Sequence, residues 1–398
     1  MLTSHLLSIL AAAAPAATAP STFTRLEPCG HPVAEISVPC VERFRYSAKA
    51  SQRLIGRKDE VWWMDGDTLT MIARPKQSWI ALCCGIQTPL DPVGTDGLAS
   101  ITVRIPRAKE AVFDVGTAGP RGAKTLAIFR GPASPSAPKL SRPLRGTIAP
   151  LAIKSRALGE VRRGSVYVPP GIPPQARLPV IYLADGATSN FAPILEAAIR
   201  EGRAAPAIIV GIDSAQGTVD GCIDKCDRRG LEYLVDWNHT ETMGSSPFGR
   251  HLRFVVDELV PYIEAHYPAS PNRQDRVTAG YSNGAAWALA AAEARPDLFG
   301  KVLAMSSGSK AVGDYGYRLK DSRVFAGAGI LEGGTMHQRT REVAEAAKRA
   351  GADVRFRELV AGHSFLLWDI LFAEGVSWLL PPPLRSKITH PEARAGKP

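Results

Sequence analysis

Residues 276–284 read RVTAGYSNG, and this stretch decides the fold. An apolar, β-like run leads up to Ser282, and an Ala-rich helical segment that stops at Pro296 follows it. Gly280 and Gly284 stand two residues before and two residues after the serine. A chain that turns directly from a strand into a helix needs very small residues at these two places. The spacing therefore predicts a sharp turn that exposes the Ser282 hydroxyl above the end of a strand.

The chain beyond residue 150 alternates short apolar strands with helical segments. Such alternation predicts a mostly parallel, doubly wound sheet with helices on both faces, which is the α/β class. We expect this domain to span residues 151–380. The predicted strands are 164–168, 178–183, 207–212, 276–279, 302–305, 324–329 and 354–359, and the predicted helices are 192–201, 252–267, 284–294 and 336–350.

Residues 23–130 have a different pattern, in which short β-like runs are separated by turn residues. Asp65-Gly66-Asp67 and Asp96-Gly97 predict hairpin turns, and the glycine-rich stretch 116–125 predicts a turn between two strands. We expect a small all-β sandwich domain here, joined to the next domain by a Pro- and Ser-rich linker over residues 131–150. The predicted strands are 61–63, 69–73, 79–86, 101–105 and 111–115.

Both ends of the chain are expected to lie outside these two domains. Residues 1–22 contain an apolar run that ends in Ala17-Thr18-Ala19, a pattern typical of a signal peptide with its cleavage site. We therefore expect a periplasmic or secreted protein, or a cytoplasmic one if this segment is not a signal peptide. Residues 381–398 lack an apolar pattern and predict a disordered basic tail. Beyond the N-terminal segment, no run has the apolar length of a membrane-spanning helix.

The composition favours a soluble enzyme or binding protein over a nucleic-acid-binding one. The 398 residues include 48 Lys and Arg against 38 Asp and Glu, for a formal net charge of +10. These basic residues are scattered and predict a generally basic surface, without a patch for nucleic acid. A basic surface also suits an acidic small substrate. The oligomeric state is left open.

The six cysteines lack the C-x-x-C spacing of metal sites, and we expect neither a metal nor another cofactor. Cys222 and Cys226 flank a short loop and are one candidate disulfide, and Cys29 with Cys40 is another. Either would fit an oxidising compartment. Cys83 and Cys84 are adjacent in a predicted strand, so that their side chains are expected on opposite faces.

A serine hydroxyl is a weak nucleophile at neutral pH and needs a base that is itself oriented by an acid. In α/β-hydrolases the chain order is serine, acid, histidine. His363 follows the last predicted strand, and Glu332 follows the strand before it, so we predict these two residues as base and acid. The rival candidates are less well placed: His337 lies in a helix, His390 in the tail, and Asp314, Asp321 and Asp353 all precede a strand.

Negative charge that develops on a substrate oxygen needs backbone N–H donors. One normally comes from the residue after the nucleophile, which is Asn283, and the other from the loop after an early strand. The strand 178–183 ends in Leu183-Ala184-Asp185-Gly186-Ala187. The N–H of Gly186 or Ala187 is therefore the predicted second donor.

Several short stretches together resemble the enterochelin esterase-like branch of the Putative esterase family, which also contains esterase D-like, feruloyl esterase and mycolyltransferase members. The resemblance covers about residues 55 to 380. The stretches that carry it are Val166-Tyr167-Val168-Pro169-Pro170, Leu183-Ala184-Asp185-Gly186, Ile209-Val210-Gly211-Ile212-Asp213, Arg229 with Glu232-Tyr233, the segment around Ser282, Ser306-Ser307-Gly308-Ser309, Gly329 with Glu332, and Gly362-His363 with Trp368.

This resemblance implies an α/β-hydrolase fold preceded by an immunoglobulin-like β domain. It also implies a serine esterase that works through an acyl-enzyme on a small-molecule ester, such as the trilactone of a ferric catecholate siderophore. Arg229, Arg250 and Trp368 are then the expected substrate contacts. Ser364 stands where siderophore esterases usually carry an acidic residue, and Ala285 replaces a frequent glycine. Feruloyl or acetyl esters of polysaccharides stay open as substrates, and a non-catalytic envelope or carbohydrate-binding protein is the alternative from another class.

Overall fold

A computed structural model describes residues 23–26, 43–76, 80–95, 97–120, 122–219, 226–235, 246–307, 318–333 and 336–382 of the chain. The predicted signal segment and the tail beyond Pro382 lie outside these residues. Three of the four candidate cysteines, Cys29, Cys40 and Cys222, lie outside them as well, as does the hairpin residue Asp96, so neither candidate pair can be followed. Cys83 is buried and disulfide-bonded.

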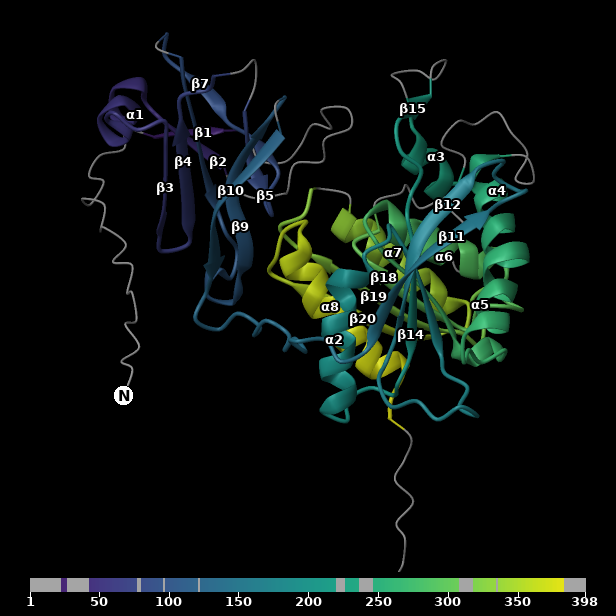
Figure 1. Ribbon diagram of the computed structural model, residues 1–398. Coiled ribbons are helices and arrows are strands. Elements are labelled where there is room, and N and C mark those ends of the chain that lie inside the picture. Colours follow the sequence, from purple (N-terminus) through teal and green to yellow (C-terminus); the bar gives the residue numbers. More distant parts are fainter. Residues whose placement is uncertain are drawn as a thin grey trace, which may run out of the picture.

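Two antiparallel sheets form the N-terminal part of the protein, drawn in purple and blue in Figure 1. One has the strand order β1-β2-β8-β4-β3, with β7 paired to β8, and the other has the order β10-β9-β5-β6. Leu69, Ile101 and Phe113 lie in a core to which both sheets contribute. The strands are β1 Phe23–Leu26, β2 Arg43–Tyr46, β3 Glu60–Asp65, β4 Thr68–Ala73, β5 Ala81–Cys84, β6 Thr88–Pro89, β7 Asp91–Val93, β8 Leu98–Arg104, β9 Val112–Gly119 and β10 Gly122–Arg130.

The predicted hairpin at Asp65-Gly66-Asp67 is confirmed, because β3 and β4 pair on either side of it and Gly66 has a φ of 59°. The predicted turn between two strands over residues 116–125 is present, but it is shorter than predicted. Gly116 lies inside β9 opposite Thr125 of β10, where a Cβ atom would stand 2.1 Å from the carbonyl oxygen of Lys124. Glycine is needed there for the close approach of two strands, and the turn itself is confined to the residues between Gly119 and Gly122.

The N-terminal part is not entirely β-structure. Helix α1, Ala48–Ile55, packs against β8 and begins at Ser47, whose side chain accepts a hydrogen bond from the backbone N–H of Ala50. A short 3₁₀ turn, η2, spans Ala108–Glu110. The sequence analysis predicted neither element. Both are too short for the periodic spacing of apolar residues in a helix to become visible.

The C-terminal part is built on one eight-stranded sheet with the order β11-β12-β14-β13-β17-β18-β19-β20. All strands from β14 to β20 along this order run parallel, whereas β11 and β12 are antiparallel to their neighbours. The predicted α/β architecture is confirmed. The strands are β11 Thr147–Lys154, β12 Val161–Val168, β13 Val180–Ala184, β14 Ile208–Ile212, β17 Arg276–Tyr281, β18 Lys301–Met305, β19 Arg323–Gly329 and β20 Asp353–Leu359, and β15 Thr218–Val219 pairs with β16 Cys226–Asp227 apart from the sheet.

Helices cover both faces of this sheet, as its fully buried central strands require. Helices α2 and α8 share a core with one face, and α6, α7 and the α4–α5 stretch share a core with the other (Figure 1). The helices are α2 Thr188–Arg200, α3 Arg228–Tyr233, α4 Pro247–Arg253, η3 Phe254–Leu259, α5 Val260–His266, η4 Arg273–Asp275, α6 Asn283–Ala294, α7 Met336–Arg349 and α8 Phe365–Leu379. The predicted helix 252–267 corresponds to α4, η3 and α5 in succession, where η3 is π-helical just before Pro261, which has no backbone N–H to donate.

The segment between the two parts is held against the α/β part. Glu196 of α2 accepts hydrogen bonds from the backbone N–H groups of Arg145 and Gly146, at 2.9 and 2.7 Å. Strand β11 begins at Thr147, inside the range predicted as linker, and Pro150 is tolerated there because β11 is an edge strand. Within the described residues, no helix is both long and apolar enough to cross a membrane.

Candidate active site

Ser282 lies at the sharp turn between β17 and α6 that the spacing of the two glycines predicts. Its backbone has a φ of 55° and a ψ of −129°, a conformation that costs energy for any residue with a Cβ atom. A Cβ atom on Gly280 would stand 2.2 Å from the carbonyl oxygen of Gly284. The two glycines therefore let the strand and the helix cross at backbone contact, and the strained serine projects from the crossing.

His363 and Glu332 lie beside this serine in a continuous chain of hydrogen bonds. Ser282 Oγ is 3.1 Å from His363 Nε2, and His363 Nδ1 is 2.7 Å from Glu332 Oε1. The Glu332 side chain is fully buried, and its second oxygen accepts the backbone N–H of Gly329 at 2.7 Å. A carboxylate that accepts from Nδ1–H leaves the neutral imidazole with a lone pair on Nε2, facing the serine hydroxyl. The three residues have the geometry of a nucleophile, a base and an orienting acid.

Trp368 of α8 packs behind the histidine ring. The two rings meet edge to face with centroids 4.9 Å apart, and the indole Nε1–H donates to Ser306 Oγ at 3.0 Å. On its other side Trp368 stacks on Tyr281 at 4.3 Å. Trp368 is only 6% exposed, so it restricts the orientation of the imidazole and presents little surface to a substrate.

The turn between β13 and α2 reaches the same place. Asp185 and Gly186 in this turn have φ values of 65° and 63°. A Cβ atom on Gly284 would lie 2.9 Å from both Ala184 Cβ and Asp185 Oδ2, so the turn touches the first residues of α6. The N-terminal ends of α2 and α6, which are the positive ends of the helix dipoles, thus meet beside Ser282. The predicted donors Asn283, Gly186 and Ala187 all lie in these two turns.

Helix α3 holds this turn through Asp185. Arg229 donates from Nε and Nη2 to the two carboxylate oxygens at 2.6 and 2.7 Å, and the Tyr233 hydroxyl accepts the backbone N–H of Asp185 at 3.0 Å. Burial lowers the pKa of Arg229, but the hydrogen bonds to Asp185 and the charge interactions, chiefly with Asp185, together outweigh burial, so the pKa is raised. Arg229 and Tyr233 therefore fix the residue that precedes Gly186.

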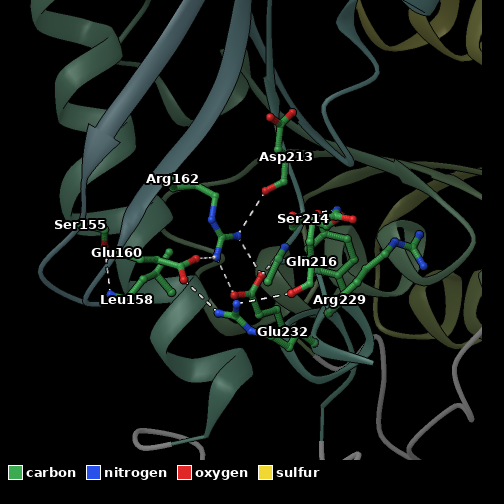
Figure 2. A network of polar contacts seen from close by, with 12 residues as sticks. Ser155, Leu158, Glu160, Arg162, Asp213, Ser214, Gln216, Arg229 and Glu232 are labelled. Carbon is green, nitrogen blue, oxygen red and sulfur yellow. Dashed lines mark hydrogen bonds and ion pairs between the residues drawn. The ribbon is translucent and has the colours of Figure 1, made fainter. Parts of the chain in front are cut away.

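A buried charge network fixes α3 in turn, as Figure 2 shows. Arg162 of β12 donates to both oxygens of Glu232, at 2.8 and 2.6 Å, and also to Glu160 at 2.7 Å. The side chains of Arg162 and Glu232 are only 3% and 8% exposed. In Figure 2 Arg229 projects from the same helix away from this network, which leaves it free to reach Asp185.

The three residues predicted to contact the substrate are therefore placed differently from one another. Arg229 is paired with Asp185, and Trp368 is buried against His363. Arg250 lies on α4 and lines a cavity of about 100 Å³, whose wall also includes Glu160, Arg228 and Glu232. The wall of this cavity includes none of the three residues Ser282, Glu332 and His363. Phe365, at the start of α8, is the exposed aromatic side chain next to Trp368, at 5.1 Å between ring centroids and 37% exposed.

The sequence analysis gave no role to Asp185 or Glu232, although both lie in stretches that carried the family resemblance. The signal was present in the spacing of Arg229 and Tyr233, which stand four residues apart, share one side of a helical turn and both contact Asp185. Gly85, which accepts the backbone N–H of His363 at 2.8 Å, had no signal in the sequence. The described residues contain no group of three or more His, Cys, Asp or Glu side chains placed to hold a metal ion.

Several solved structures are similar to this chain. The enterobactin esterase FES from Shigella flexneri, crystallised in the presence of enterobactin, has a TM-score of 0.59 at 15% identity, over 81% of this chain and 95% of that chain. The ferric enterobactin esterase from Salmonella typhimurium has a TM-score of 0.57 at 16% identity, over 83% and 98%. A ferulic acid esterase from Anaeromyces mucronatus reaches 0.46 at 18% identity, over 60% and 92%. The first two likenesses show a shared fold.

Comparison of the sequence alone gives a further result. No curated protein matches it significantly. The family described as Putative esterase, however, matches residues 155–379, which is more than half of the 398-residue chain and includes Ser282, Glu332 and His363. The chain belongs to the Putative esterase family.

Proposed function

We propose that the protein is a serine esterase in which Ser282 is the nucleophile, His363 the general base and Glu332 the acid that orients it. The observation that carries this proposal is the chain of hydrogen bonds from Ser282 Oγ through His363 to the buried Glu332, at 3.1 and 2.7 Å. A serine that only caps α6 needs neither the base nor the acid.

The reaction follows from this geometry. Ser282 Oγ attacks the ester carbonyl carbon while its proton passes to His363 Nε2. The negative charge on the carbonyl oxygen is stabilised by the N–H groups of Asn283 and of Gly186 or Ala187. When the bond to the alcohol breaks, the leaving oxygen takes the proton from His363 and an acyl-enzyme remains. Water then repeats the sequence and releases the acid, so that the chain's own groups and water account for every step.

An ester that carries an aromatic group close to the scissile bond is the substrate class that the site supports best. Tyr281, Phe365 and Trp368 form a connected aromatic group next to Ser282 and His363, and Phe365 is exposed. The net charge of +10 suits an anionic ligand. The similar enterobactin esterase structures cover 81% to 83% of this chain, so the likeness extends into the N-terminal part. These observations favour the trilactone ester of a catecholate siderophore.

The same likeness supports an immunoglobulin-like fold for the two N-terminal sheets, which we include in the proposal. A periplasmic or secreted location is supported by the signal-peptide pattern of residues 1–22 and by the disulfide bond of Cys83, since disulfides persist in oxidising compartments.

A hydrolysis screen tests the substrate class. Purified protein and its Ser282→Ala variant would be compared on p-nitrophenyl acetate, ferric enterobactin and methyl ferulate. We expect ferric enterobactin to give the highest kcat/KM, with a loss of several orders of magnitude in the variant. Preference for methyl ferulate would favour the polysaccharide esters instead. Equal rates for the two proteins on every ester would favour a non-catalytic envelope or carbohydrate-binding protein.

A further inference from the structure

We propose that the N-terminal β-structure is a working part of the catalytic site, because the carbonyl of Gly85 and the strands beside it position His363 and Glu332. This inference rests on the proposed function, since it assigns a positioning role to residues outside the triad. It makes the catalytic base dependent on a part of the chain that lies outside residues 155–379, the range of the family match.

The contact with the histidine is made by backbone atoms. The N–H of His363 donates to the carbonyl oxygen of Gly85, at the end of β5, at 2.8 Å. A Cβ atom on the preceding residue, Gly362, would lie 2.1 Å from both the carbonyl carbon and the oxygen of Gly85. Only glycine at position 362 permits this approach, so the backbone at the base is in direct contact with the N-terminal part.

Strand β9 makes a second contact with the same segment. The N–H of Val112 donates to the carbonyl of Val360 at 2.9 Å, and Val112 forms a parallel bridge with Ala361. The carbonyl of Ala361 accepts the N–H of Leu331 at 3.0 Å. Because Leu331 precedes Glu332, the segment fixed by β9 fixes the acid as well as the base.

The side chains at this boundary form one core. Leu331 and Val360, next to the acid and close before the base, are 0% and 2% exposed and pack in the same cluster as Leu82, Ile86 and Phe113 of the N-terminal part. Cys83, two residues before Gly85, is also buried and disulfide-bonded. Because the side chains of a closely packed core have few alternative places to pack, such a core transmits small displacements.

For the serine, by contrast, no backbone hydrogen bond of this kind links it to the described residues of the N-terminal part. Ser282 is carried by β17 in the middle of the sheet, where its backbone N–H donates to Met305 of the neighbouring strand β18 at 2.9 Å. The distance between the nucleophile and the base thus depends on two parts of the protein, the central sheet that carries Ser282 and the N-terminal strands that contact His363. A shift of about 1 Å between such groups is enough to cost on the order of 100-fold in rate.

The test compares Gly362→Ala with Gly146→Ala. The control adds the same methyl group against backbone, 2.5 Å from the carbonyl oxygen of Val168, at the opposite end of the sheet from Ser282. We expect Gly362→Ala to lower kcat for p-nitrophenyl acetate by on the order of 100-fold per folded molecule, with KM changed about twofold or less. Gly146→Ala should lower the fraction folded but keep kcat per folded molecule.

A milder variant in the N-terminal part covers the case in which Gly362→Ala does not fold. Gly85→Ala brings a Cβ atom to 3.0 Å from Phe113 Cβ and Asp114 N, and should lower kcat on the order of tenfold. Crystal structures of the variants give the distance from His363 Nε2 to Ser282 Oγ even if the protein hydrolyses no ester, which separates this proposal from the proposed function. An increase beyond hydrogen-bond distance supports positioning. An unchanged 3.1 Å in both variants, or a kcat equal to that of the control, overturns it.

Discussion

Arg229 and Asp185 form a bidentate ion pair, with nitrogen–oxygen distances of 2.6 and 2.7 Å, directly beside the turn that carries Gly186 and Ala187. The Asp185 side chain is only 9% exposed, so removal of Arg229 would leave a nearly buried carboxylate without its partner. We predict that Arg229→Met lowers kcat on p-nitrophenyl acetate by about 10- to 100-fold, because an unpaired carboxylate next to the developing oxyanion opposes it. Steady-state kinetics with this neutral ester measure the effect.

A double-mutant cycle separates this role from substrate binding. If Arg229 acts through Asp185, Asp185→Asn combined with Arg229→Met should recover part of the loss. If Arg229 instead binds the substrate, the single variant should raise KM for anionic esters and leave p-nitrophenyl acetate unaffected. That second pattern would contradict the ion-pair account.

Glu332→Gln tests the acid without changing its size. The amide can face Nδ1 with its oxygen or with its NH₂ group, and it no longer stabilises the imidazolium that forms during attack. We expect kcat to fall by roughly 10²- to 10⁴-fold while KM changes little. Asp353, which the sequence analysis rejected, pairs with Arg323 on the sheet surface, and Asp353→Asn should leave kcat unchanged. A large loss of kcat in Asp353→Asn together with an unchanged kcat in Glu332→Gln would show that the acid is misassigned.

The ion pair between Arg162 and Glu232 should matter for stability, since both side chains are buried. Removing one partner leaves the other as an uncompensated buried charge, which costs about 3–5 kcal/mol. We predict a loss of this size in the free energy of unfolding for Arg162→Met, measured by urea denaturation. The variant Arg162→Met/Glu232→Leu should be less destabilised than the single one. A single-variant loss below about 1 kcal/mol would be too small for a buried pair.

Stability should also depend on pH through His251. Burial lowers the pKa of this histidine to about 4 from 6.5, and the charges of Glu232 and Arg162 act on it in opposite directions. Between these two pH values the unfolded chain binds a proton there and the folded protein does not, so stability falls as the pH is lowered through this window.

The variant His251→Phe removes this titration, and its ring can occupy the same position between Tyr233 and Trp287. As the pH falls from 6.5 towards 4, we expect the melting temperature of the original protein to decrease more than that of the variant. A difference in melting temperature that stays constant across the window would show that His251 does not contribute to it.

The sequence allowed the positions of the parallel strands along the chain and the turn at Ser282 to be predicted, because both depend on local patterns. Runs such as Ile208–Ile212 are apolar throughout, and the glycines around Ser282 follow from the turn itself. Strand β11 was missed because Pro150 and the polar residues around it resemble a linker, and its pairing with β12 is a matter of tertiary structure. Strand β10 was missed because the glycines that let it approach β9 resemble a turn.

The candidate site likewise contains some residues that the sequence predicts and others whose roles depend on tertiary contacts. Ser282, His363 and Glu332 were predicted from their positions after strands, and the structure places them within hydrogen-bond distance of one another. Arg229 and Trp368 were placed near the site by resemblance, but their partners Asp185 and His363 only become clear when distant segments are brought together. The role of Gly85 could not be predicted from the sequence, because this residue acts through its backbone carbonyl and has no side chain that would indicate a function.

Labelling with a fluorophosphonate probe tests the central claim most directly, because the probe reacts with a serine only when a base activates it. The original protein, Ser282→Ala and His363→Ala would be treated in parallel, and the modified peptide would be identified by mass spectrometry. The account predicts one label per molecule on the peptide that contains Ser282, none in Ser282→Ala and very slow labelling in His363→Ala. Labelling of Ser282→Ala at the original rate, or no labelling of the folded original protein, would contradict it.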